Sequence, residues 1–151
     1  MSKARTVKIR SYLDIQEEYV LSGIVKPGYL VMVESTNLVT YHTVSGGIAP
    51  IPMFAQENEF LGKTIDTAYA VDERLQVWIP TRGDVVNAVL KKGQNVGIGD
   101  RLVSNGDGTL KIYVLTGSNK EDSRAIVGLA MEAINLTAST AVDTHIAVRI
   151  A

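Results

Sequence analysis

The sequence predicts an all-β domain, or a mainly β domain with a short helix, built as a compact barrel or sandwich. Three observations predict it: short apolar runs recur along the chain, turn-forming residues separate them, and no segment shows the long apolar period of an amphipathic helix. A chain of 151 residues fits a single domain. Within it we expect an extended N-terminal arm and lead-in over residues 1–25 and a β-rich domain over residues 26–151.

The N-terminal residues have the two-residue period of an extended chain. Apolar side chains occupy odd positions and basic or aromatic side chains occupy even ones, in the order Val7, Lys8, Ile9, Arg10, Tyr12 and Leu13. Two interpretations stay open here. The segment is either an ordinary edge strand or an arm that lies on a partner, because terminal segments are ordered only when something holds them.

The other elements are predicted from apolar runs and the turns between them. Lys26-Pro27-Gly28 predicts a turn that leads into a strand, and Asn105-Gly106-Asp107-Gly108 predicts a hairpin between two β-branched runs. Residues 126–134 fit helix or strand, and the short length with Gly128 favours a strand that ends in a turn. Further strands are expected at residues 29–34, 39–44, 75–79, 85–90, 101–104, 109–114 and 144–150, with an irregular segment or short strand between residues 49 and 61.

Composition narrows the class of protein. A net charge of -1 gives no positive field for nucleic acid, and the absence of cysteine removes disulfides, thiolate nucleophiles and thiolate metal sites. Hydrophobic residues make up 46% of the chain, which favours an oligomer. No apolar stretch is long enough for a membrane span, so we expect a soluble, cytoplasmic product.

Residues with catalytic chemistry are few and scattered. His42 and His145 both fall inside strand patterns without metal-ligand neighbours, and neither is assigned a role. We therefore expect no enzyme, no cofactor and no metal site. One rival remains, an enzyme that uses carboxylates alone as glycosidases do, with candidates at Glu57, Glu59, Asp66 and Asp72.

Three short motifs fail as binding signatures. Gly62-Lys63-Thr64 lacks the earlier glycine of a phosphate loop, and Asn105-Gly106-Asp107-Gly108 lacks the remaining ligands of a calcium loop. Arg82-Gly83-Asp84 spells the tripeptide that integrins recognise, but we interpret its glycine as the turn into the next strand.

Taken in order, the segments of the chain resemble the decoration, or cement, proteins of tailed-bacteriophage heads. The resemblance covers nearly the whole chain and depends on the order and spacing of its turns and strands. It runs through the basic N-terminus, Lys26-Pro27-Gly28-Tyr29-Leu30-Val31, Pro52-Met53-Phe54-Ala55, Gln76-Val77-Trp78-Ile79-Pro80, Arg82-Gly83-Asp84-Val85-Val86-Asn87-Ala88, Gly93-Gln94-Asn95-Val96, Ile98-Gly99-Asp100, residues 127–133 and residues 146–150.

The resemblance implies a structural virion protein, made in the host bacterial cytoplasm, that sits on the outer surface of the capsid. It implies homotrimers that hold neighbouring major capsid proteins together in the expanded head, with no direct contact to nucleic acid or membrane. The N-terminal arm would lie across a capsid subunit. The capsid-binding residues expected on it are Lys3, Arg5, Val7, Lys8, Ile9, Arg10 and Tyr12.

A binding or carrier domain of the barrel-sandwich type is the alternative. Gly93, Val96, Gly99 and Leu102 are similar to the turn pattern of biotinyl and lipoyl carriers. Those domains present a modifiable lysine within Asp-Lys-Ala or Met-Lys-Met, and neither string occurs in this chain. The fold could be shared without the carrier function.

Overall fold

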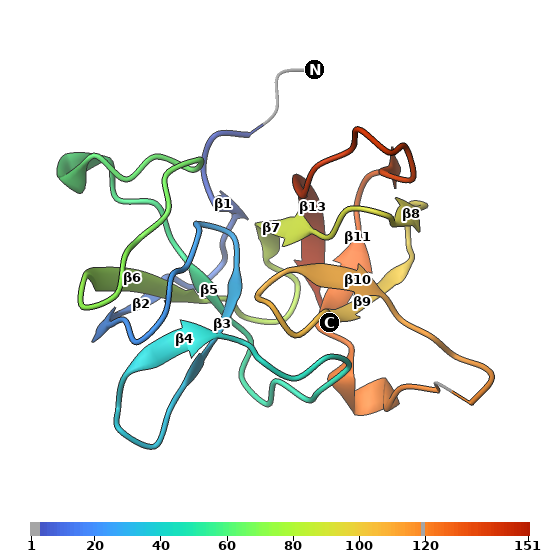
Figure 1. Ribbon diagram of the computed structural model, residues 1–151, viewed down its shortest axis with the longest axis horizontal. Coiled ribbons are helices and arrows are strands. Elements are labelled where there is room, and N and C mark those ends of the chain that lie inside the picture. Colours follow the sequence, from blue (N-terminus) through green and yellow to red (C-terminus); the bar gives the residue numbers. More distant parts are fainter. Residues whose placement is uncertain (1–3, 119) are drawn as a thin grey trace.

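Two large β-sheets and a two-stranded ribbon make up the protein, as seen in a computed structural model that describes residues 4–118 and 120–151 (Figure 1). The only helical elements in these two ranges are short 3-10 turns. The strands are β1 (Lys8–Arg10), β2 (Ile15–Val20), β3 (Leu30–Val33), β4 (Val39–Tyr41), β5 (Met53–Ala55), β6 (Arg74–Ile79), β7 (Val85–Leu90), β8 (Asn95–Val96), β9 (Arg101–Ser104), β10 (Leu110–Ile112), β11 (Gly128–Ala130), β12 (Ile134–Asn135) and β13 (Thr144–Ile150), and the 3-10 turns are η1 (Glu59–Leu61) and η2 (Ser123–Ala125).

The first sheet closes into a five-stranded barrel. Its strands follow the order β7-β10-β9-β11-β13, and β13 pairs again with β7 over the six positions from Thr144 to Arg149. The β7–β10 pairing is parallel and the others are antiparallel. β1 is added to the outside of β7, and the short β8–β12 pair forms a separate ribbon. The all-β expectation is confirmed, with a barrel as its form.

The second sheet also curls toward closure. Its strands follow the order β2-β6-β5-β3-β4, and its two edges meet at a parallel bridge between Leu21 and Val39. Figure 1 shows this unit beside the first barrel, with β2, β3, β4, β5 and β6 on the left and β7, β9, β10, β11 and β13 on the right. Two closed or nearly closed sheets therefore share one chain.

The two units share a core, because side chains along β3, β5 and β6 alternate between the two faces of their sheet. In β3, β5 and β6, successive side chains point to opposite faces of the sheet. One face contributes to the core of the first barrel and the other to a core inside the second sheet. The residues of the first set are Leu30, Phe54 and Trp78, and those of the second set are Val31, Ala55, Leu75 and Val77, all at most 2% exposed.

Most of the strands follow the sequence expectation. The turn at Lys26-Pro27-Gly28 places Gly28 at a φ of 88° and leads into β3, and β9 pairs with β10 as an antiparallel hairpin. Residues 126–134 form a strand and a turn, as expected. Neither β2 nor the two-residue strand β8 was predicted from the sequence. β2 is largely exposed and so shows no apolar period.

No helix in the described part of the chain is long and apolar enough to cross a membrane.

Candidate functional site

The N-terminal segment from Ala4 to Val20 pairs with one strand of each of the two large sheets. β1 pairs with β7, with Lys8 opposite Val86, and β2 pairs with β6 over its whole length. In Figure 1 the segment is the dark blue trace that passes from the top of the molecule to β2. Where it is described, the expected arm contributes one strand to each of this chain's two large sheets.

Polar side chains of the domain hold the start of this segment by its backbone. Glu57 accepts a hydrogen bond from the Val7 N–H at 2.9 Å through Oε2. Asn87, which is buried in β7, donates from Nδ2 to the carbonyls of Ala4 at 3.1 Å and Thr6 at 3.3 Å. Sequence reasoning missed both anchors, although a polar residue inside the apolar run 85–90 is a signal for a buried hydrogen bond.

A buried carboxylate holds the end of the same segment. Asp84 is fully buried and accepts hydrogen bonds from the backbone N–H of Tyr12 and of Thr81, each at 2.8 Å. The Thr81 hydroxyl donates to it as well, at 3.1 Å. Since these donors occupy the carboxylate, the Arg82-Gly83-Asp84 tripeptide cannot present its acid to a receptor. The interpretation of this motif as a turn fits the φ of 96° at Gly83.

Two of the predicted contact residues serve this chain's own structure. Val7 is fully buried in the core of the first barrel. The Lys8 ammonium lies 2.5 Å from a carboxylate oxygen of Asp14 and 5.7 Å from the centre of the Trp78 ring. This ion pair, mainly through its hydrogen bond, lowers the pKa of Asp14. The basic face predicted for this segment therefore does not include Lys8, because its ammonium group contacts residues of this chain.

The other predicted contact residues present their side chains to solvent. Arg5 and Arg10 are exposed, Ile9 is 42% exposed and Tyr12 is 70% exposed. Their backbones are nevertheless held by the contacts above and by the β1–β7 pairing. Lys3 lies outside the described residues. The segment is thus an ordered strip with exposed cationic, aliphatic and aromatic side chains.

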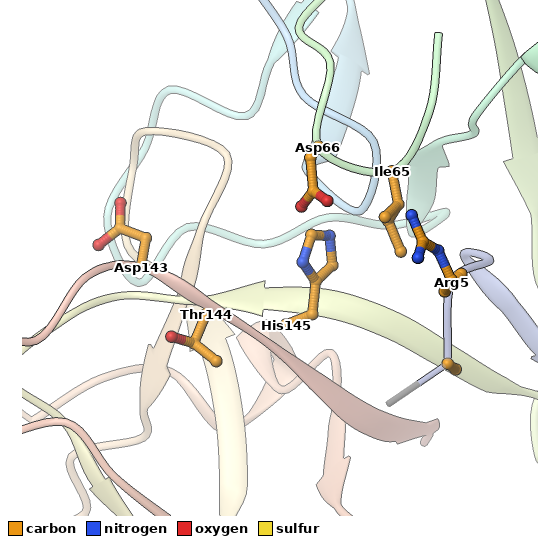
Figure 2. Close-up of a pocket in the computed structure, with 7 residues that line it drawn as sticks. Arg5, Ile65, Asp66, Asp143, Thr144 and His145 are labelled. Carbon is orange, nitrogen blue, oxygen red and sulfur yellow. The ribbon is translucent and has the colours of Figure 1, made fainter. Parts of the chain in front are cut away.

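A pocket of about 500 Å³ opens beside the start of this segment (Figure 2). In Figure 2 the Asp66 carboxylate points toward the His145 imidazole, Arg5 lies on the side of Ile65, and Asp143 lies on the opposite side. The residues that line it are Ala4, Arg5, Ile65, Asp66, Asp143, Thr144 and His145. Three parts of the chain that are far apart in sequence therefore meet here.

The polar groups of this pocket are partly engaged already. His145 Nε2 lies 3.1 Å from the carbonyl oxygen of Pro27. Asp143 lies 3.5 Å from the Lys91 ammonium and accepts a hydrogen bond from the Lys92 N–H at 2.8 Å. Within residues 4–118 and 120–151, no group of three His, Cys, Asp or Glu side chains could hold a metal ion.

The four carboxylates named as glycosidase-like candidates lie in different settings. Glu57 holds the Val7 backbone, Glu59 begins the 3-10 turn η1, and Asp72 occupies a turn at a φ of 66°. Of the four, Asp66 lines the pocket of Figure 2. The structure does not gather them around that pocket.

The Asn105–Gly108 segment is the tip of the β9–β10 hairpin. Its Asp107 carboxylate is 2.7 Å from the Lys91 ammonium and accepts hydrogen bonds from the N–H and hydroxyl of Thr109. Burial acts to raise the pKa of Asp107, but the hydrogen bonds from Lys91 and Thr109 outweigh it and lower the pKa to about 2. The carboxylate is committed to holding the turn, which is the interpretation favoured over a calcium loop.

His42 lies in the interior, not in a site. It is 5% exposed, and its Nδ1 lies 2.8 Å from the hydroxyl oxygen of Ser104 on β9. Burial lowers the pKa of His42, and hydrogen bonds with the backbone of Ile48 and Val44 offset this only in part. The neutral ring is therefore the form that the folded protein prefers.

We expect the free energy of unfolding to fall as the pH is lowered from about 6.5 toward 5. The pKa of His42 is below 6.5 in the folded protein, so the unfolded chain takes up the proton first. The stabilisation is complete above the unfolded pKa and is lost toward the folded one. Urea unfolding at pH 7.5 and pH 5.5 measures the change, and His42→Asn should reduce it. An equal loss in the variant would contradict the assignment to His42.

No family model and no curated protein matches this chain. Among solved structures, the fold is similar to that of the N base of head fiber gp8.5 in bacteriophage phi29, with a TM-score of 0.58 and 13% sequence identity, over 92% of this chain and 95% of that chain. At this identity the likeness shows a shared fold. The two-sheet all-β architecture of this chain is thus one that a bacteriophage head fiber also has.

Proposed function

We propose that this protein is a structural component of a tailed-bacteriophage virion that binds the outside of the head and holds neighbouring major capsid proteins together. The observation that carries the proposal is the ordered N-terminal strip, with Arg5, Ile9, Arg10 and Tyr12 exposed on a backbone held by the domain. The fold shared with a head fiber base supports the same assignment. The proposal gives the protein no reaction and no cofactor.

An ordered strip suits this role because less conformational entropy is lost when it binds. Exposed arginines complement an acidic surface, and a tyrosine contributes a large contact area at low entropic cost. Homotrimers would bring three such strips to the shell at once. Linked contacts raise the overall affinity without any single tight interface.

Charge reversal on the strip tests the proposal. We expect the double variant Arg5→Glu and Arg10→Glu to bind expanded heads that lack this protein at least about tenfold more weakly than the unchanged protein, because cations facing an acidic shell become anions. Co-sedimentation with such heads measures binding, and their resistance to heat measures stabilisation. Tyr12→Ala should weaken binding as well.

Matched controls separate the strip from the rest of the surface. Ile98 is 74% exposed on the turn between β8 and β9, outside the strip, so Ile98→Ala should leave binding unchanged where Ile9→Ala weakens it. Lys92→Glu is the charge control, on an exposed residue outside the strip. Side-chain substitution is preferable to deletion of residues 1–13, because deletion would remove Val7 from the core. Equal binding by strip and control variants would refute the role of the strip.

Trimer formation is tested separately. Light scattering of the free protein should give a mass that is a multiple of three chains. The number of copies bound per head should also be a multiple of three. Stoichiometries that are not multiples of three on fully decorated heads would contradict the trimer.

A further inference from the structure

β2 is a strand with one paired edge and two exposed faces. It pairs with β6 from Ile15, opposite Ile79, to Val20, opposite Arg74. Five of its six residues are exposed, and Tyr19 is half-buried. The far edge of the second sheet reaches β2 only at the Leu21–Val39 bridge, beyond the end of the strand.

The hydrogen-bond pattern shows which backbone groups of β2 face outward. Leu21 N–H bonds the Glu73 carbonyl on the β6 side at 3.0 Å, whereas Ser22 N–H bonds the Val39 carbonyl on the opposite side at 2.9 Å. On β6, the Gln76 carbonyl accepts a hydrogen bond from the Gln56 N–H at 2.9 Å and therefore faces β5. The backbone N–H and carbonyl of the next residue, Val77, face β2. Because these directions alternate along a strand, the backbone groups of residues 16, 18 and 20 point away from β6.

These outward groups form an unpaired edge in the described part of the chain. No backbone hydrogen bond outside the β2–β6 ladder uses the N–H or carbonyl of Gln16, Glu18 or Val20. An exposed edge of this kind is a template on which another extended chain can pair.

The charged residues of β2 itself are both acidic. Residues 11–25 contain Asp14, Glu17 and Glu18 and no lysine or arginine. Lys8 pairs with Asp14, and Arg74 pairs with Glu18 at 2.6 Å. Glu17 accepts a hydrogen bond from the Tyr19 hydroxyl and has no cationic partner among the described residues.

The acidic side chains of β2 indicate which kind of strand can pair with its open edge. If the β2 strands of two copies paired, their acidic side chains would face one another, which destabilises a sheet. A strand that carries lysine or arginine would instead place cations against Glu17 and Glu18. The exposed Ile15 and Val20 at the two ends of β2 can also contact apolar side chains of an added strand.

We propose that the open edge of β2 binds an extended, basic segment of a partner protein as an added strand. The added strand would hydrogen-bond to the backbone of Gln16, Glu18 and Val20, and its cations would face Glu17 and Glu18. This interaction uses a different surface from the arginine strip and does not depend on the role proposed for that strip.

Amide hydrogen exchange of the whole protein tests the proposal with a defined probe. The probe is a blocked ten-residue peptide of alternating lysine and threonine, and its glutamate–threonine counterpart is the control peptide. At low ionic strength the lysine peptide should slow exchange of the residue 16, 18 and 20 amides by about tenfold, as expected for new backbone hydrogen bonds. The control peptide should not change these rates.

Two variants distinguish strand addition from simple charge attraction. Glu18→Pro removes an outward N–H without breaking the β6 ladder, so it should abolish the protection, whereas Glu18→Gln keeps the N–H and should weaken it only in part. The double variant Glu17→Lys and Glu18→Lys should reverse the preference toward the glutamate peptide. Unchanged exchange at millimolar lysine peptide, equal protection by both peptides, or protection that survives Glu18→Pro would overturn the proposal.

Discussion

Replacing Gly128 with alanine is expected to lower the free energy of unfolding by at least about 3 kcal/mol. Gly128 lies in β11, between β9 and β13, opposite Leu102 on one side and Ile150 on the other. A Cβ at this position would lie 2.4 Å from the carbonyl oxygen of Arg149 and 2.7 Å from a side-chain carbon of Val148. β13 cannot move aside cheaply, because it also pairs with β7 along six positions.

Urea unfolding followed by the fluorescence of Trp78, the single tryptophan, measures this change. Gly117→Ala is the control, since a Cβ there meets no atom of the described residues within 4 Å and the expected cost comes from its φ of 94°. We expect the control to lose about 1 kcal/mol. A loss below 1 kcal/mol for Gly128→Ala would show that the barrel wall adjusts to the added methyl group.

Truncating Trp78 to alanine is expected to destabilise the protein by about 3–5 kcal/mol. Trp78 is fully buried in the core that joins the two sheets, opposite Gln16 on one neighbouring strand and Phe54 on the other. Its removal would leave a cavity between the two units. Circular dichroism during thermal and urea unfolding provides the measurement, because the tryptophan signal is lost.

Trp78→Phe separates ring volume from the indole N–H. The Trp78 Nε1 atom is buried without a hydrogen-bond partner among the described residues, so its loss should cost nothing in hydrogen bonding. The variant should therefore lose less than half as much stability as Trp78→Ala. Equal losses for the two variants would mean that the indole N–H contributes an interaction of its own.

The sequence predicted the elements whose side chains pack against the core. Residues 75–79, 85–90 and 144–150 were expected as strands and form β6, β7 and β13. Each carries apolar or β-branched side chains that one or both faces bury, and this burial is the signal that a periodicity argument detects. β2 was not predicted because its side chains are largely exposed. Such a strand is held by backbone pairing, which does not require a particular pattern of side chains.

The candidate strip was predicted in part. The basic and aromatic residues before Asp14 were predicted to form a contact surface, and Arg5, Arg10 and Tyr12 are exposed, while their role in contacts stays a prediction. The sequence alone did not show that Val7 would be buried and that Lys8 would contact this chain's own residues. These two outcomes depend on the core beneath β7 and on Trp78, both far along the chain.

By itself the sequence determined the all-β class, the hairpins and the turn glycines, because these depend on local dihedral preferences and on the alternation of side chains between two faces. Only the tertiary structure decided that the chain makes two large curled sheets, that the N-terminal segment pairs with one strand of each, and that its exposed residues form an ordered strip. Those outcomes depend on long-range contacts, from Asp84 and Asn87 to the backbone of residues 4–12, and from β13 back to β7. The energy of such contacts is set by which groups meet in space, and local patterns of residues along the chain do not reveal which distant groups will meet.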